Sequence, residues 1–250
     1  MSAEIETRAN QRELMRMRVA RLLFELLYRN RTLYWLASTL PFAGQWRVWQ
    51  RLALTRLRGE DVLEVGCGIG GLLADMLERG YRCQAIDRSP QMVAATRREL
   101  RRRRLGDGAA TVRQANVQAL PFATASFDSV VSTFPTDYIA DARALSEIHR
   151  VLRPGGRLIV VLSATLLPTR ALLAPLIAVQ RLVYGQRAIA AQTNAQPGIA
   201  APLLQRMRTA GFTPRLEQAH GPFWLAYVIT AAATTHTTQA IPATQNPTQS

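Results

Sequence analysis

The sequence predicts an α/β protein built on a doubly wound, mostly parallel sheet, with a helical cap at its N-terminal end. From Asp61 onward, short apolar segments alternate with amphipathic ones, as in parallel sheets whose strands are joined by helices. The segment 157–162 is almost wholly apolar, which is expected of a strand covered on both faces. With 250 residues, 48% of them hydrophobic, the chain is long enough to bury a sizeable core.

The predicted elements follow one another in a regular order. Gly80 ends the first helix of the sheet region, and Pro154 and Gly155 follow the third. Two late strands are joined by only a short link, which suits an antiparallel hairpin at the sheet edge and makes the last strand antiparallel. The seven expected strands are 61–65, 83–86, 111–115, 129–132, 157–162, 213–218 and 223–230. The expected helices between them are 72–79, 91–105, 142–152 and 202–210.

Three segments flank or interrupt this pattern. Residues 1–57 predict a helical cap or lid, with an amphipathic, Arg-rich helix at 11–29 and a short helix at 45–57. The apolar region 164–200 predicts a lid insertion within a domain that spans 58–230. Residues 231–250 carry no formal charge and offer little apolar surface, so we expect a disordered tail there.

Charge and cysteine content limit the class of protein. The net charge is +14 and all 31 basic residues are Arg, which is a weak indication of an anionic partner or surface. Two Cys are too few and too far apart for a disulfide framework or a zinc site, so no metal is expected. Neither a secretory signal nor an uninterrupted apolar span of membrane length is present, and we expect a cytoplasmic protein.

The stretch from Val62 to Gly70 carries the functional prediction. An apolar strand leads into a glycine cluster that permits a tight turn and close approach of a ligand to the backbone. Glu64, just before the glycines, suits a ligand with an ammonium group. Asp87 lies 21 residues after Gly66, the spacing expected of a carboxylate that binds the ribose hydroxyls of a nucleotide. These residues alone leave a nicotinamide nucleotide open.

Four stretches taken together resemble the class I S-adenosylmethionine (SAM)-dependent methyltransferase family, in its small-molecule branch that includes ubiquinone/menaquinone-type enzymes. They are the glycine stretch with Glu64, then 85–92, 119–131 and 147–158. The resemblance covers roughly residues 61–162 and implies a Rossmann-like fold with SAM as cofactor. It also disfavours a nicotinamide oxidoreductase, because the last two stretches match no dinucleotide pattern.

The resemblance further implies a set of cofactor-binding residues. Glu64 and the glycine loop would hold the methionine part, Asp87 the ribose, and the residues after the third and fourth strands the adenine and the methyl-donor pocket. Asn116 departs from the family's usual Asp, because Asn accepts a hydrogen bond but brings no charge. The implied contacts are Glu64, Gly66, Cys67, Gly68, Gly70, Asp87, Arg88, Met92, Asn116, Val117, Thr133 and Phe134.

The acceptor side is less well marked. Methyl transfer mainly requires alignment of donor and acceptor, and a general base only when the acceptor must lose a proton. Asp137 and Tyr138 are the candidates to orient or deprotonate the acceptor, although Thr136 or Asp137 is more readily explained as a helix N-cap. His149 is more readily explained as structural, and His220 is a weak candidate.

The apolar cap and insertion favour a small, hydrophobic acceptor. The Arg-rich helix at 11–29 could contact an anionic membrane surface or simply pack on the domain. Nucleic acid is not favoured, because the Arg run at 97–104 is most simply a solvated helix face. An RNA or protein methyltransferase and a SAM-binding protein without catalysis remain the alternatives, and the oligomeric state is not predicted.

Overall fold

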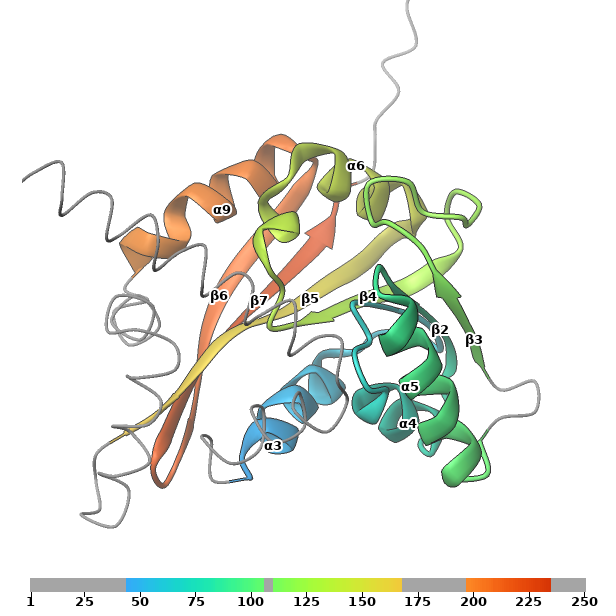
Figure 1. Ribbon diagram of the computed structural model, residues 1–250. Coiled ribbons are helices and arrows are strands. Elements are labelled where there is room, and N and C mark those ends of the chain that lie inside the picture. Colours follow the sequence, from blue (N-terminus) through green and yellow to red (C-terminus); the bar gives the residue numbers. More distant parts are fainter. Residues whose placement is uncertain (1–43, 106–109, 168–196, 235–250) are drawn as a thin grey trace, which may run out of the picture.

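The computed structural model describes residues 44–105, 110–167 and 197–234, and a single twisted sheet runs through its centre (Figure 1). Seven strands form this sheet in the order β3-β2-β1-β4-β5-β7-β6. Only β7 runs antiparallel to its neighbours; the other pairings are parallel. The predicted doubly wound, mostly parallel sheet with an antiparallel last strand is therefore confirmed. The strands are β1 (Asp61–Val65), β2 (Arg82–Asp87), β3 (Ala110–Gln114), β4 (Phe127–Thr133), β5 (Leu152–Leu166), β6 (Phe212–Gly221) and β7 (Trp224–Ala233).

Helices cover both faces of the sheet, and each face has its own core (Figure 1). Side chains alternate along a strand, so Leu158 and Val160 of β5 enter one core and Ile159 and Val161 the other. The first core includes α6 and α9, and the second includes α4, α5 and η2. The helical elements are α3 (Trp46–Gln50), η2 (Arg51–Arg56), α4 (Gly71–Leu77), α5 (Pro90–Arg102), η3 (Asp137–Ala140), α6 (Ala142–Val151) and α9 (Pro197–Thr209).

Several element boundaries differ from the sequence-based prediction. Strand β5 extends to both sides of 157–162, because its first residues pair with Phe127 before an irregularity in the β4 register. Helix α9 begins at Pro197 and contains Pro202, which was expected to start it. A proline removes only one helical hydrogen bond, so the helix continues through it at a cost. Strand β7 runs three residues beyond the expected end of the domain at residue 230.

The flanking segments are only partly described. The expected short helix at 45–57 is present as α3 followed by the 3-10 helix η2, with Trp49 fully buried. The two ends of the expected insertion 164–200 belong to β5 and α9. The helix expected at 11–29, most of the insertion and residues 235–250 lie outside the described residues.

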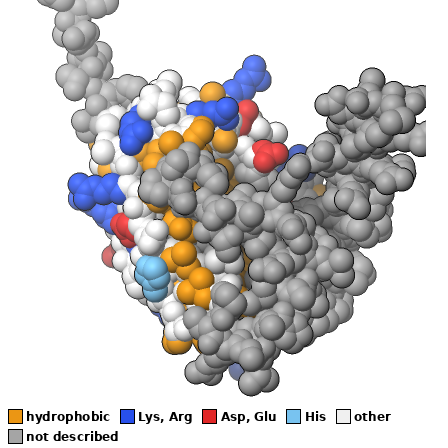
Figure 2. All heavy atoms as spheres, turned by 90° about the vertical axis from the view of Figure 1, so that its left-hand side faces the viewer, with side chains coloured by type: hydrophobic (Ala, Val, Ile, Leu, Met, Phe, Trp, Pro, Cys, Tyr) orange, Lys and Arg blue, Asp and Glu red, His pale blue; other side chains and the backbone are white. Residues whose placement is uncertain are grey.

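The edge of the sheet at β6 presents a mixed surface. Seen from this side, a strip of hydrophobic side chains lies between charged ones (Figure 2). In the β6–β7 hairpin, Leu216, Ala219 and Leu225 are half-buried apolar residues. Within the described part of the chain, no helix is long and apolar enough to cross a membrane.

The cap of helix α6 corrects one sequence-based expectation. Thr136 precedes the single turn of η3 and its side chain makes no capping hydrogen bond, and Asp137 is exposed. The N-cap of α6 is instead Asp141, whose Oδ1 accepts a hydrogen bond from the Ala144 backbone N–H at 2.9 Å. Helix α6 begins at Ala142, as the sequence predicted, so the residue directly before it provides the cap and not Thr136 or Asp137.

We predict that Asp141→Ala lowers the free energy of unfolding by about 1 kcal/mol, because an N–H at the start of α6 loses its acceptor. Asp137→Ala is the matched control and should change stability by less than about 0.5 kcal/mol. Urea unfolding of both variants measures the difference. Equal destabilisation by the two substitutions would contradict this assignment of the cap.

Candidate functional site

The candidate site lies at the carboxyl ends of β1, β2 and β4, where the strand order reverses beside β1. After Val65 the chain turns through a glycine loop, residues 66–70. The backbone N–H groups of Gly66 and Cys67 both donate to the Ile86 carbonyl, at 2.9 and 3.1 Å. The loop is thus bonded to the neighbouring strand β2 at the point where a ligand would approach.

Glycine is required at Gly70 for two reasons. Its φ is +79°, in the left-handed region that L side chains rarely adopt. A Cβ at this position would also lie 2.7 Å from Thr96 Cγ2 and 2.9 Å from Thr96 Cα, so helix α5 packs directly against the loop. The Thr96 hydroxyl donates to the Gly68 carbonyl at 2.8 Å, which fixes the loop from the same side.

Asp87 joins the two loops of the site. One carboxylate oxygen accepts from the Gly68 N–H at 3.0 Å, and the other accepts from the Ser89 N–H at 2.8 Å. Burial raises the pKa of Asp87, while these backbone hydrogen bonds act in the opposite direction. Each oxygen can accept a further hydrogen bond, so the carboxylate is held in place without being saturated. The structure therefore brings the sequence-predicted Asp87 and glycine loop together.

Glu64 is the unusual group of the site. It is 1% exposed, and its register neighbours on β2 and β4 are the apolar Ala85 and Val131. Within the described residues, its Oε2 atom has no hydrogen-bond partner. Burial raises the pKa of Glu64 to about 8, Arg47 acts to lower it, and the negative charge of Asp87 adds to the increase. A backbone hydrogen bond from Leu73 also acts to lower this pKa. A buried carboxylate with one unsatisfied oxygen is costly, so the site is suited to a ligand that supplies a cationic hydrogen-bond donor.

The expected nucleoside contacts follow β2 and β3 at the same sheet edge. Arg88 and Asn116 are exposed, and the Asn116 Oδ1 accepts from the Gln118 N–H at 3.3 Å. Met92 and Val117 are buried, at 1% and 6% exposure. The Met92 N–H also donates to the Ser89 hydroxyl that caps helix α5. Contacts of these four residues with adenosine stay predictions.

Thr133 and Phe134 lie at the end of β4, beside the N-terminal elements. Phe134 has a φ of +51°, a strained conformation for a residue with a side chain, and its N–H donates to the Val161 carbonyl at 2.8 Å. Its ring stacks on Trp46 of α3 with 4.1 Å between centroids. Trp49 contacts both Phe134 and Trp224 edge-on, each at 6.4 Å. These four rings form an aromatic cluster between β4, β7 and α3.

The two catalytic candidates occupy different environments. Tyr138 is half-buried, and its hydroxyl lies 2.6 Å from the Ser132 hydroxyl and 3.3 Å from the Val65 carbonyl. A Cβ on Gly66 would be 3.0 Å from the same hydroxyl, so Tyr138 packs against the start of the glycine loop. Asp137 is exposed on η3. A role in catalysis stays a prediction for both residues.

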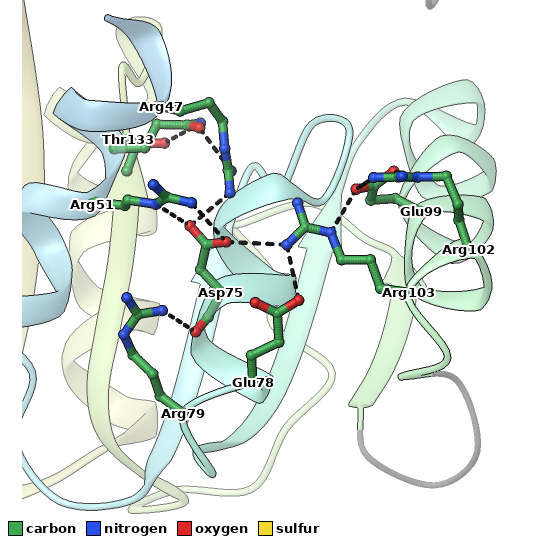
Figure 3. Close-up of polar contacts among 10 residues, drawn as sticks. Arg47, Arg51, Asp75, Glu78, Arg79, Glu99, Arg102, Arg103 and Thr133 are labelled. Atoms are coloured by element: carbon green, nitrogen blue, oxygen red, sulfur yellow. Dashed lines mark hydrogen bonds and ion pairs between the residues drawn. The ribbon is translucent and has the colours of Figure 1, made fainter.

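An ion cluster that was not predicted from the sequence lies beside the glycine loop (Figure 3). Asp75 of α4 is 1% exposed and pairs with Arg47 and Arg51, each at 2.6 Å, and with Arg103 at 3.2 Å. Burial opposes ionisation of Asp75, but the Arg51 hydrogen bond and the Arg47 charge leave its pKa lowered. An acidic residue on the apolar face of a predicted helix was the signal that could have identified it.

His149 is half-buried against Phe212 and does not lie at this site. Its ring meets Phe212 edge-on at 5.1 Å between centroids, on the α6 side of the sheet. His220 is exposed near the end of β6. Neither position adds a group to the glycine loop.

Comparison with known proteins gives consistent similarities. Residues 63–160 match the family described as methyltransferase domain. Demethylmenaquinone methyltransferase of Corynebacterium efficiens is 37% identical over 131 residues, which are 51% of this chain and 53% of the relative. The match to this enzyme and to three similar ones spans about half of the length of each relative. The enzyme of the same name from Mycobacterium sp. (strain JLS) is 32% identical over 193 residues, 74% of this chain and 79% of the relative.

Solved structures share the fold. A putative SAM-dependent methyltransferase from Methanococcus maripaludis superposes with a TM-score of 0.58 at 18% identity, covering 79% of this chain and 89% of its own. A geranyl diphosphate methyltransferase in complex with GPP and sinefungin gives a TM-score of 0.54 at 16% identity, covering 74% and 76%.

Glu64 predicts a specific pH dependence of SAM binding. With a pKa near 8, most of this carboxyl is protonated at pH 6, and an ammonium ligand needs the ionised form. The affinity for SAM should therefore rise by more than about tenfold from pH 6 to pH 8. Glu64→Gln should bind SAM weakly, and its affinity should no longer rise between pH 6 and pH 8. Glu60→Gln is the control, because Glu60 forms an exposed ion pair with Arg82, and this variant should keep the full rise in affinity.

The ligand-free protein provides a second measurement. Because the folded pKa of Glu64 lies above its unfolded value of 4.5, the folded state binds the extra proton between pH 4.5 and 8. Glu64 should thus lower stability progressively as the pH rises through this window, and Glu64→Gln should remove that slope from thermal unfolding. Identical pH profiles of wild type and Glu64→Gln, in binding and in stability, would contradict the raised pKa.

Proposed function

Because the chain belongs to the class I SAM-dependent methyltransferase family, we propose that it transfers a methyl group from SAM to a small, hydrophobic acceptor. The observation that carries the proposal is the buried Glu64 carboxylate, whose Oε2 lacks a partner within the described residues, beside a loop shaped by Gly66 and Gly70. A cationic amino-acid end on a nucleoside would fit this arrangement, with Asp87 as the group that would bind the ribose hydroxyls.

Residues of the chain would hold SAM along the sheet edge. Glu64 would take the ammonium group, Asp87 the ribose hydroxyls, and Asn116 with Val117 the adenine. When bound, SAM supplies a methyl group on a sulfonium sulfur, and S-adenosylhomocysteine remains after transfer. The chain's own task is to align the acceptor and to exclude water from it.

The aromatic cluster supports a hydrophobic acceptor. Trp46 and Phe134 are half-buried at the end of β4, so part of each ring is accessible beside the expected methyl-donor pocket. Leu166 and Trp224 are buried in the same apolar cluster and support these two rings. Apolar and aromatic walls bind apolar ligands with few oriented polar groups. The relatives named above act on demethylmenaquinone, so a quinone-type acceptor is the first class to test.

A general base is needed only if the acceptor must lose a proton in the reaction. Tyr138 would then be better placed than Asp137, because its hydroxyl lies at the glycine loop. The hydrogen bonds to Ser132 and the Val65 carbonyl would give Tyr138 a second role, which is to hold the ends of β1 and β4 together directly before the loop.

The alternative acceptors named above are less well supported. In the Arg run of α5, Arg97 donates to the Val112 carbonyl, and Arg102 and Arg103 pair with Glu99. These guanidinium groups stabilise the helix and its neighbour, which leaves fewer of them for phosphates. Membrane contact through residues 11–29 and a cytoplasmic location stay predictions.

The direct test is transfer of isotopically labelled methyl groups. We expect the purified chain to label a component of a lipid extract and not bulk RNA or protein, and Glu64→Gln to reduce the labelling strongly. Labelling of RNA or protein instead would support the alternative acceptors. The same assay should be repeated on a metabolite extract that includes polar compounds. If the chain binds SAM but labels nothing in any extract, the result would contradict catalysis and favour a SAM-binding protein.

The aromatic cluster yields a separate prediction. Trp46→Ala should raise the KM for the hydrophobic acceptor about three- to tenfold, the effect of one lost aromatic contact, with little change in SAM affinity. Trp46→Phe should restore most of the loss. Val48→Ala, at an exposed position of the same helix, is the control and should leave both constants unchanged. An unaltered acceptor KM in Trp46→Ala would place the acceptor elsewhere.

A further inference from the structure

We propose that Arg47 binds the carboxylate of the amino-acid end of SAM, and that Asp75 is the positioning residue that holds Arg47 in place for it. The inference rests on the proposed function and adds a residue from α3, outside the matched methyltransferase segment 63–160, to the cofactor site.

Arg47 reaches the end of the glycine loop from α3. A Cβ on Gly71, the residue that follows the loop, would overlap the Arg47 guanidinium, so the two are in direct contact. The Arg47 side chain is 29% exposed and Asp75 almost fully buried. Its neighbour Gln50 accepts from Arg47 at 3.4 Å and donates to the Thr133 hydroxyl at 3.3 Å. Helix α3 therefore contacts both the residue that follows the glycine loop and the end of β4; Figure 3 shows its side chains reaching Thr133 and Asp75.

Glu64 and Arg47 carry opposite charges but do not form an ion pair with each other. The positive charge of Arg47 is close enough to Glu64 to favour the ionised carboxylate. Nevertheless Arg47 pairs with Asp75, and the Oε2 of Glu64 stays without a partner among the described residues. An amino acid carries its ammonium and carboxylate on one carbon atom, so a site for it needs one anionic and one cationic group side by side. Glu64 and Arg47 supply these two groups at the two ends of the glycine loop, because Glu64 precedes the loop on β1 and Arg47 contacts Gly71, which follows it.

Asp75 explains why Arg47 does not form an ion pair with Glu64. Its carboxylate is shared among three guanidinium groups, those of Arg47, Arg51 and Arg103. This shared contact holds Arg47 in place but does not neutralise its charge fully, so Arg47 can still attract a second anion. A guanidinium has five N–H donors, so some remain for that anion. Without the Asp75 charge, Arg47 would be drawn toward Glu64 and would close the space between them.

The rival explanation is that Arg47 only attaches α3 to the domain. A ligand that lacks the carboxylate separates the two explanations, because a purely structural role affects every nucleoside equally. The probes are SAM, S-adenosylhomocysteine and decarboxylated SAM, which keeps the amine, sulfonium and nucleoside. Calorimetric titration of the full chain measures each dissociation constant.

We expect Arg47→Gln to weaken SAM and S-adenosylhomocysteine at least about tenfold and decarboxylated SAM less than about twofold. Arg51→Gln is the matched control, because Arg51 pairs with the same Asp75 carboxylate but does not lie against Gly71. It should leave the ratio of SAM affinity to decarboxylated SAM affinity unchanged. Arg47→Lys keeps the positive charge but loses the planar guanidinium that binds a carboxylate with two hydrogen bonds, so it should reduce the ratio of SAM affinity to decarboxylated SAM affinity in part. This variant tests the proposal if Arg47→Gln does not fold. Asp75→Asn should also lower the ratio and should shift the pH dependence of SAM binding to lower pH, because Arg47 then approaches Glu64.

Equal weakening of all three nucleosides by Arg47→Gln or Arg47→Lys would overturn the proposal in favour of a structural role. No change in any of them would overturn it as well. Failure of the proposed function would look different, since the wild-type chain would then bind none of the three.

Discussion

A carboxylate that is buried at the end of a central strand, with one oxygen lacking a partner, is the constraint on which the rest of the site depends. Strand β1 places Glu64 between apolar neighbours on β2 and β4, where water cannot solvate its charge. Such a group lowers the stability of the ligand-free protein when it ionises, and the strands around it supply no donor for Oε2. The arrangement is explained if the missing donor comes with a ligand, and the neighbouring loop is shaped to admit one.

The rest of the site is fixed in advance by short-range geometry. Asp87 bonds to backbone N–H groups on both sides, Gly70 allows helix α5 to pack on the loop, and Thr96 holds the Gly68 carbonyl. A ligand would therefore meet a rigid edge formed by β1 and β2. Helix α3 brings Arg47 and Trp46 to the other side of this edge, so in the proposed site the N-terminal region would act together with the core of the fold.

Much of the fold followed from the sequence because its signals are local. The apolar strands, the glycine loop and the spacing to Asp87 predicted the sheet and the position of the site. The extension of β5 was missed because Pro154 and Gly155 indicate a break, and only pairing with Phe127 makes that segment a strand. The Arg47–Asp75 pair joins residues 28 positions apart on different helices, so no local pattern could show it. The acidic residue on the apolar face of α4 indicated a partner without naming it.

The central claim is that the Glu64 carboxyl gives up its proton when a cationic nucleoside binds. Calorimetric titration with SAM at pH 7, repeated in buffers of different ionisation enthalpy, measures this proton directly. A pKa near 8 predicts that wild type releases close to one proton per SAM bound and that Glu64→Gln releases almost none. Binding of SAM by wild type with no proton released, or with the same release as Glu64→Gln, would contradict the claim.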